Sequence, residues 1–194
     1  MTEKEKMLTG KMYIASGEEL TAERLHAKEL LSEFNALPPS EQERRNVILK
    51  QLLGKTEAQY YIEPPFRCDY GYNITIGKNF YANYNCTILD CAKIEIGDHV
   101  LLGPNVSLFT AGHPLEADER IKGLEYAYPI TIGNNVWIGG GTIINPGITI
   151  GDNSIIGSGS IVTKDIPANV VAAGNPCRII RKLDNNEDDK TQSR

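Results

Sequence analysis

The 194-residue sequence lacks the features that would place it in a membrane or on a nucleic acid. Its formal net charge is −5, so it has no basic excess to bind a phosphate backbone or an anionic lipid surface. No apolar run approaches the ~18 residues of a membrane span, and the first ten residues lack the apolar core of a secretory signal. We therefore expect a cytoplasmic protein without nucleic-acid or membrane partners.

Cysteine and histidine are few, and their spacing argues against a metal site. The four cysteines form no CxxC pair, and the three histidines lie in unrelated settings. We therefore expect free thiols and no bound metal. The residues are Cys68, Cys86, Cys91 and Cys177, and His26, His99 and His113.

What the sequence does contain is an aliphatic residue at every sixth position. This hexad runs through Ile132, Ile138, Ile144, Ile150, Ile156 and Val162, and its earlier parts are Ile76, Ala82 and Ile88, then Ile96, Leu102 and Leu108. Four positions after most of them stands a small or β-branched residue, as at Cys86, Val136 and Ser160. A period of six fits neither a helix nor an alternating strand. It is typical of a parallel β-helix, whose single repeats cannot bury their apolar side alone.

Three hexads would form one triangular coil, with a short strand on each side and Gly, Asn or Asp at the corners. The hexad residue and the residue four positions later would both point inward. Counting from Ile74 to Ala173 gives about five coils, or roughly 25 Å at ~4.8 Å per coil. The spacing does not decide the handedness. A right-handed β-helix stays open here, although its coils are longer and less regular.

Residues 1–60 depart from the hexad and predict an N-terminal helical cap on an otherwise mainly β chain. One helix is expected over residues 18–34, with a capping box at Ser40 and Glu43 starting a second that ends at Gly54. The pair should cover the open edge of the first coil. The predicted apolar side of the first helix is Leu20, Leu25, Leu30, Leu31 and Phe34. Residues 61–183 are expected to form the β-helix, with a short closing element at 178–183, and the polar tail 184–194 is expected to be disordered.

A charged, proline-bracketed excursion over residues 111–129 interrupts the hexads. So long an excursion in a regular solenoid favours a functional loop over a tolerated insertion. His113 opens it, between rigid coils and the loop, and an imidazole accepts protons near neutral pH. His113 is therefore the candidate catalytic base. We expect His26 to be a solvated helix residue and His99 to be a corner residue.

The runs NFYANYN, LGPNVSLFTAGHP and NNVWIGGG, with the N-terminal GKMYIASGEEL, resemble the maltose and galactoside O-acetyltransferases. The resemblance covers roughly residues 5–183 and is strongest to the maltose-acetylating members. It implies a left-handed β-helix of hexapeptide repeats with an N-terminal α-helical segment. It also implies acetyl-CoA as co-substrate, a sugar hydroxyl as acceptor, and a homotrimer with active sites between adjacent prisms.

The resemblance assigns roles to residues around the acceptor. His113 matches the catalytic base, and Asn83 matches the residue that stabilises the oxyanion or positions the acceptor. Tyr81 would pack on the sugar, while Glu125 would contact the acceptor or orient His113. The remaining predicted acceptor contacts are Asp69 and Arg24, together with Asp90, which could substitute because Cys91 stands where some relatives have an acidic ligand.

The acetyl-CoA side is implied in the same way. Trp137, Gly140 and Ser158 would flank the pantetheine arm, although corner geometry alone also explains the glycines. The residues expected near the phosphates are Thr163, Lys164, Arg178 and Arg181.

Three other functions compete with sugar O-acetylation. The first is N-acetylation of an amine-bearing antibiotic on the same fold, although such enzymes usually carry a longer loop and lack this helical segment. The second is a non-catalytic β-helix scaffold, which would not bind CoA. The third, a zinc enzyme resembling a γ-type carbonic anhydrase, is rejected because it needs three converging histidines.

Overall fold

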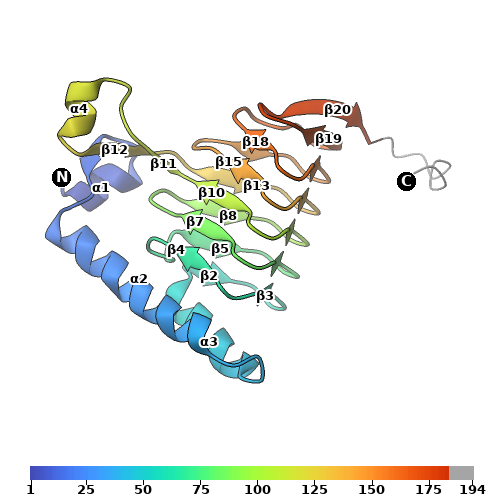
Figure 1. The fold of residues 1–194 in the computed structure, drawn as a ribbon, viewed down its shortest axis with the longest axis horizontal. Helices are drawn as coiled ribbons and strands as arrows, with labels where there is room; N and C mark the ends of the chain where they lie inside the picture. The colour runs from blue at the N-terminus through green and yellow to red at the C-terminus, as the bar shows by residue number, and fades with distance from the viewer. Residues whose placement is uncertain (184–194) are drawn as a thin grey trace.

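Short parallel strands stack into the three sheets of a triangular prism in the computed structural model, which describes residues 1–183 (Figure 1). The first sheet contains β4 (Arg67–Cys68), β7 (Thr87–Leu89), β10 (Ser107–Phe109), β15 (Ile143–Ile144) and β18 (Ile161–Val162). The second contains β2 (Lys55–Thr56), β5 (Ile74–Ile76), β8 (Ile94–Ile96), β13 (Ile130–Ile132) and β16 (Thr149–Ile150). The third contains β3 (Tyr61–Ile62), β6 (Tyr81–Ala82), β9 (Leu101–Leu102), β14 (Trp137–Ile138), β17 (Ile155–Ile156), β19 (Val170–Ala173) and β20 (Arg178–Lys182).

The predicted inward residues form the core. No predicted hexad residue is more than 3 % exposed, and the small or β-branched residues that follow four positions later, such as Cys86, Val136 and Ser160, are buried as well. The hydroxyls at these inward positions are paired, since Ser154 donates to the carbonyl of Pro167 at 2.8 Å and Thr142 to that of Gly157 at 3.3 Å. The mainly β fold of parallel stacked coils is confirmed.

The corners hold residues in the left-handed backbone region. Asn79, Asn105, Asn135 and Asn153 have φ between 56° and 59° there. His99 has φ of 58°, which confirms that it is a corner residue.

The coils begin earlier than the hexad predicted. Strand β2 pairs with β5 in the register Thr56 to Ile76, and β3 pairs with β6 in the register Ile62 to Ala82. Residues 55–68 therefore already form a coil, whereas the sequence placed the start of the β-helix at residue 61. The coil was missed because the polar Thr56 opens it and a two-residue slip separates it from Ile76.

Helices α2 (Glu18–Ala36) and α3 (Gln42–Leu52) cross the open end of the first coil (Figure 1). Phe34 and Leu49 are fully buried there, in one cluster with Ile62 and Phe66. Two details of the prediction are wrong. Leu25 is 57 % exposed, and α3 begins after Glu41 with no side-chain cap bond, so Ser40 and Glu43 form no capping box.

The excursion folds into an arm that we define as residues 111–129. Strands β11 (Ala111–Gly112) and β12 (Leu124–Ala127) pair antiparallel and flank α4 (Ala117–Ile121). The N-terminal segment, with α1 (Glu3–Leu8), adds β1 (Tyr13–Ile14) to the outer side of β12. At the other end of the prism, β20 folds back antiparallel on β19, which confirms the predicted closing element. The predicted disordered tail lies outside the described residues.

Candidate functional site

His113 follows β11, at the point where the arm leaves the coils. Its side chain is exposed, and its Nδ1 lies 3.2 Å from the carbonyl oxygen of Leu124 on β12. A carbonyl oxygen only accepts hydrogen bonds, so Nδ1 carries the proton of the neutral ring. The lone pair is then on Nε2. The arm therefore presents His113 in the tautomer that a proton acceptor requires.

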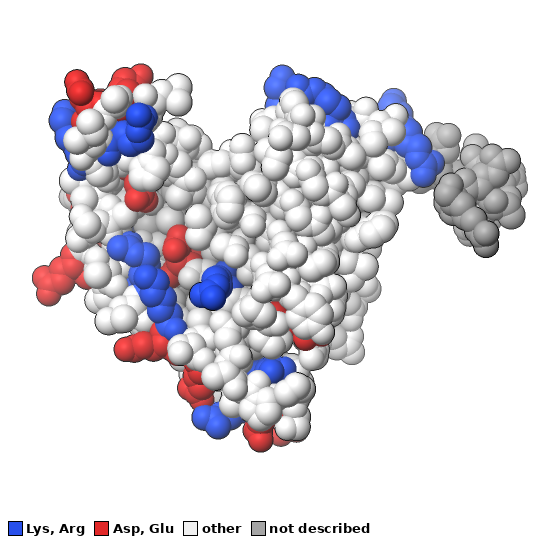
Figure 2. Space-filling view, in the orientation of Figure 1, with Lys and Arg blue, Asp and Glu red and all other residues white. Residues whose placement is uncertain are grey.

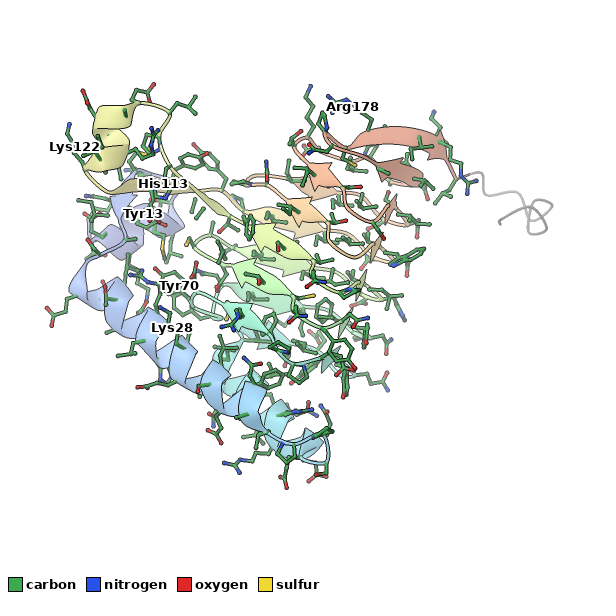
Figure 3. All side chains as sticks on the ribbon, viewed as in Figure 1. Tyr13, Lys28, Tyr70, His113, Lys122 and Arg178 are labelled. Atoms are coloured by element: carbon green, nitrogen blue, oxygen red, sulfur yellow. The ribbon has the colours of Figure 1, made fainter. Side chains whose placement is uncertain are left out.

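A cavity of about 320 Å³ opens beside His113. It is lined by polar groups from three separate parts of the chain, namely Asp69, Cys91 and Glu125. A second hollow of about 220 Å³ shares these three residues and adds Arg24 and Tyr70. Figure 3 shows the labelled Tyr13, Tyr70 and His113 on the same side of the molecule, between α2 and the arm. The structure thus joins four of the predicted residues: Arg24, Asp69, His113 and Glu125.

Glu125 is held by a residue to which the sequence analysis gave no role. The Tyr13 hydroxyl donates to the Glu125 carboxylate at 2.8 Å, and the two residues pair directly across β1 and β12. Burial raises the pKa of Tyr13, so the phenol stays a neutral donor. Tyr13 lay in the GKMYIASGEEL run, but only the antiparallel register of two segments 112 positions apart brings it to the site.

Asp69, Cys91 and Arg24 form the floor of the smaller hollow. The Cys91 thiol donates to the Asp69 carboxylate at 3.4 Å, and burial raises the pKa of both groups. Arg24 donates to the Tyr70 hydroxyl at 2.6 Å and to the Ala15 carbonyl at 2.7 Å. Half-buried and hydrogen-bonded, Arg24 is a fixed positive charge near Asp69 rather than a free surface cation.

The predicted contact between Asp90 and the acceptor is corrected by the structure. Asp90 is completely buried, and its carboxylate accepts from the backbone N–H groups of Asp69 at 3.0 Å and Tyr70 at 2.9 Å. It also accepts from the N–H of Asn73 at 3.4 Å. Burial raises the pKa of Asp90 to about 7 although these N–H groups favour the charged form. Asp90 therefore shapes the 69–73 turn and lies out of reach of a ligand.

Asn83 and Tyr81 lie apart from His113 within one chain. Asn83 follows β6 at a corner, where its side-chain oxygen accepts from the N–H of Tyr84 at 2.8 Å. Tyr81 stacks on Tyr61 with the ring centres 6.2 Å apart. Neither residue lines the cavities beside His113.

The residues predicted to contact acetyl-CoA lie on later coils. Trp137 is 52 % exposed on β14, and Gly140 and Ser158 occupy the corners that follow β14 and β17. A Cβ at Gly139 would lie 2.5 Å from the Ser158 nitrogen, so close contact between coils itself requires that glycine.

The predicted phosphate contacts, Thr163, Lys164, Arg178 and Arg181, are all exposed. The first two follow β18 and the arginines lie on β20. Figure 2 shows basic side chains over the C-terminal coils, across a hollow from the charged tip of the arm.

No metal-holding group of three or more His, Cys, Asp or Glu residues occurs in residues 1–183. In the same part of the chain, no helix is long and apolar enough to cross a bilayer.

Comparison with known proteins gives two family matches. The maltose acetyltransferase hexapeptide capping motif matches residues 6–57, and the bacterial transferase hexapeptide (six repeats) matches residues 129–164. Galactoside O-acetyltransferase of Escherichia coli (strain K12) is 51 % identical over 183 residues, which cover 94 % of this chain and 90 % of that protein.

Solved structures agree with these matches. A maltose O-acetyltransferase from Clostridium difficile 630 is 58 % identical with a TM-score of 0.94, covering 95 % of this chain and 98 % of that one. A galactoside acetyltransferase in complex with coenzyme A is 52 % identical with a TM-score of 0.92, covering 95 % of this chain and 92 % of that one.

Proposed function

The chain belongs to the galactoside and maltose O-acetyltransferase family, and we propose that it transfers an acetyl group from acetyl-CoA to a hydroxyl of a sugar, with His113 as general base. The observation that carries the proposal is the hydrogen bond from His113 Nδ1 to the Leu124 carbonyl. It leaves the Nε2 lone pair available at the edge of a cavity that Asp69 and Glu125 help to line. His99, at a coil corner, does not line this cavity.

The chemistry follows from this geometry. His113 Nε2 takes the proton of the sugar hydroxyl while that oxygen attacks the thioester carbonyl carbon. The tetrahedral oxyanion collapses, the carbon–sulfur bond breaks, and the imidazolium returns the proton to the departing thiolate. Asp69 and Glu125 accept hydrogen bonds from other hydroxyls of the acceptor and so orient it. Arg24 balances their charge.

Acetyl-CoA is the donor in this proposal. The exposed Trp137 offers an apolar face to the pantetheine arm beside the corners of Gly140 and Ser158. Lys164, Arg178 and Arg181 are exposed cations toward the C-terminal end, where they would meet the phosphates. Support comes from the galactoside acetyltransferase of the comparison, which was solved with coenzyme A.

We further propose that the enzyme is a homotrimer. Asn83 and Tyr81 lie outside the His113 cavities of their own chain, so they can act on the acceptor only from a neighbouring prism. A closed threefold ring of such contacts repeats one interface three times. Asn83 of one subunit would then donate a hydrogen bond to the oxyanion formed beside His113 of the next.

The test measures acetyl-CoA consumption by the wild type and by His113→Ala with maltose, glucose, galactosides, serine and amine antibiotics. We expect sugar-dependent turnover whose kcat falls by about 10²- to 10⁴-fold in His113→Ala, with an unchanged Kd for CoA. His26→Ala is the matched control, because His26 is exposed on α2. Turnover that survives without His113 contradicts the base assignment. Activity on amines alone would support N-acetylation, and absent CoA binding would support the scaffold.

A further inference from the structure

The His113 cavity continues into a larger groove of about 710 Å³ along α2. The two hollows share Asp69 and Leu89, so they form one continuous surface. The floor of the groove consists of Arg67, Asp69, Thr87 and Leu89, and Arg67 on β4 pairs with Thr87 on β7. A molecule bound beside His113 therefore has room to extend past Asp69, away from the reacting hydroxyl.

The wall of the groove is one face of α2. Lys28, Leu31, Ser32 and Asn35 line it, with the spacing of residues on a single helix face. Both atoms of the Asn35 amide are already used, one donating to the Phe66 carbonyl at 3.0 Å and the other accepting from the Phe66 N–H at 2.9 Å. That pair fixes α2 against the coils. The polar groups left for a ligand on this wall are Lys28 and Ser32.

The groove carries two basic side chains, Lys28 on α2 and Arg67 on β4. Lys28 and Arg67 are both exposed, and neither forms an ion pair with an acid in residues 1–183. The one acid that lines the groove is Asp69, where burial raises the pKa and the charges of Arg24 and Lys28 oppose that effect. Figure 2 shows Lys and Arg atoms over α2 and next to it on the face in view. Figure 3 places Lys28 on α2.

We propose that Lys28 and Arg67 form a subsite for an anionic group on an acceptor that extends beyond the acetylated sugar. This proposal rests on the proposed function and specifies its acceptor class, a glycoside or oligosaccharide whose second unit carries a carboxylate, sulfate or phosphate. A guanidinium and an ammonium that form no ion pair within residues 1–183 pair well with such oxyanions. The acetylated sugar occupies the cavity beside His113, and its second unit lies over Thr87 and Leu89.

The test compares acceptors that differ only at the far end. A phenyl glycoside of an accepted sugar is measured against its 4-carboxyphenyl, 4-sulfophenyl and 4-phosphophenyl counterparts, and the readout is the ratio of kcat/KM for the anionic and neutral acceptors. We expect a ratio of about 5 to 20 in the wild type, falling toward about 1 in Lys28→Gln/Arg67→Gln and at high salt. The matched control is Lys50→Gln/Lys78→Gln, two exposed lysines outside the groove, which should keep the wild-type ratio. The three anionic acceptors show which oxyanion is preferred.

Two results would overturn the subsite. One is a wild-type ratio near or below 1, and the other is a high ratio that the double substitution leaves in place. Neither result contradicts the proposed sugar acetylation, because turnover of the neutral glycoside measures that activity separately. If no glycoside is acetylated although CoA binds, the proposed function fails and the subsite fails with it.

Discussion

At the scale of single residues, the site depends on hydrogen bonds that fix polar side chains before any ligand arrives. The Leu124 carbonyl determines which nitrogen of His113 holds the proton, and the Tyr13 hydroxyl orients the Glu125 carboxylate. Behind them, Asp90 holds the turn that carries Asp69. The bonds of Tyr13 and Asp90 involve their own side chains, so each of these two can be tested by one substitution.

Tyr13→Phe removes the donor to Glu125 and keeps the ring. We expect KM for the acceptor to rise about 3- to 10-fold, with an unchanged Kd for CoA, because a charged hydrogen bond that orients the carboxylate is lost. Steady-state kinetics and CoA titration measure the two effects. Tyr128→Phe is the control, since Tyr128 is 45 % exposed on the arm and lies outside the His113 cavity. Equal KM values in both variants would contradict a role for Tyr13 in the site.

Asp90→Asn tests the pH dependence of stability. Burial raises the folded-state pKa of Asp90 to about 7, above the ~3.9 of an unfolded aspartate. Between these values the folded protein holds a proton that the unfolded chain has lost, so the Asp90 contribution to the free energy of unfolding falls as the pH rises. The slope is at most about 1.4 kcal/mol per pH unit.

Urea unfolding of wild type and Asp90→Asn at pH 5, 6, 7 and 8 isolates this contribution, because the asparagine does not titrate. We expect the stability of the wild type relative to the variant to fall from pH 5 to about pH 7 and then to level off. A difference that stays constant or grows with pH would show that the backbone N–H groups outweigh burial.

At the scale of elements, stacked coils approach so closely that their corners exclude side chains. Gly77, Gly97, Gly133 and Gly151 form one such column, each following a strand of the second sheet. A Cβ at Gly77 would lie 2.6 Å from the Gly97 carbonyl, and one at Gly151 would lie 2.4 Å from the Ala168 nitrogen. These glycines serve coil packing, not a ligand.

Gly97→Ala should destabilise the fold by about 1–3 kcal/mol, because its Cβ would lie 2.8 Å from the backbone carbonyl of Gly133. Gly17→Ala is the comparison. Its Cβ would have no neighbour closer than 3.9 Å, and as a helix N-cap change it should cost under about 1 kcal/mol. Chemical denaturation of both variants measures the difference. A similar decrease in the free energy of unfolding for both variants would show that the coil corner accommodates a Cβ at Gly97.

At the scale of the whole molecule, side chains fill the interior of the prism, so the cavities around His113 lie on its outside, between a face of the prism and the segments packed on it. The cap helix α2 lines the larger groove and the arm lines the His113 cavity, while Arg178, one of the predicted CoA contacts, lies toward the C-terminal end (Figure 3). Asn83 remains at a corner outside these hollows. The proposed trimer is what would bring it to a neighbour's His113.

Mixed oligomers test this sharing. His113→Ala and Asn83→Ala should each be nearly inactive alone. Coexpressed at equal amounts, they should recover about one quarter of wild-type activity, because that share of interfaces pairs an intact His113 with an intact Asn83. Light scattering should show three chains per particle. Recovery no greater than the sum of the separate variants would place both residues in one chain's site.

The sequence by itself determined the repeating part of this protein. An inward position must be filled by an aliphatic or small side chain in every coil. The sequence from Ile132 to Val162 therefore shows an aliphatic residue at every sixth position, and this period predicts the coils. His113 could also be identified from the sequence, because it lies where the excursion interrupts the regular hexads.

Only the tertiary structure decided what surrounds His113. The pairing of Tyr13 with Glu125, the burial of Asp90 and the early coil at Thr56 all depend on contacts between segments far apart in the chain. Such contacts produce no repeating sequence pattern, because each occurs only once. Their partners depend on the register of strand pairing and not on residue type alone. The hexad could therefore be predicted from local sequence, whereas the cavities around His113 depend on the packing of β1, the arm and α2 on one side of the prism.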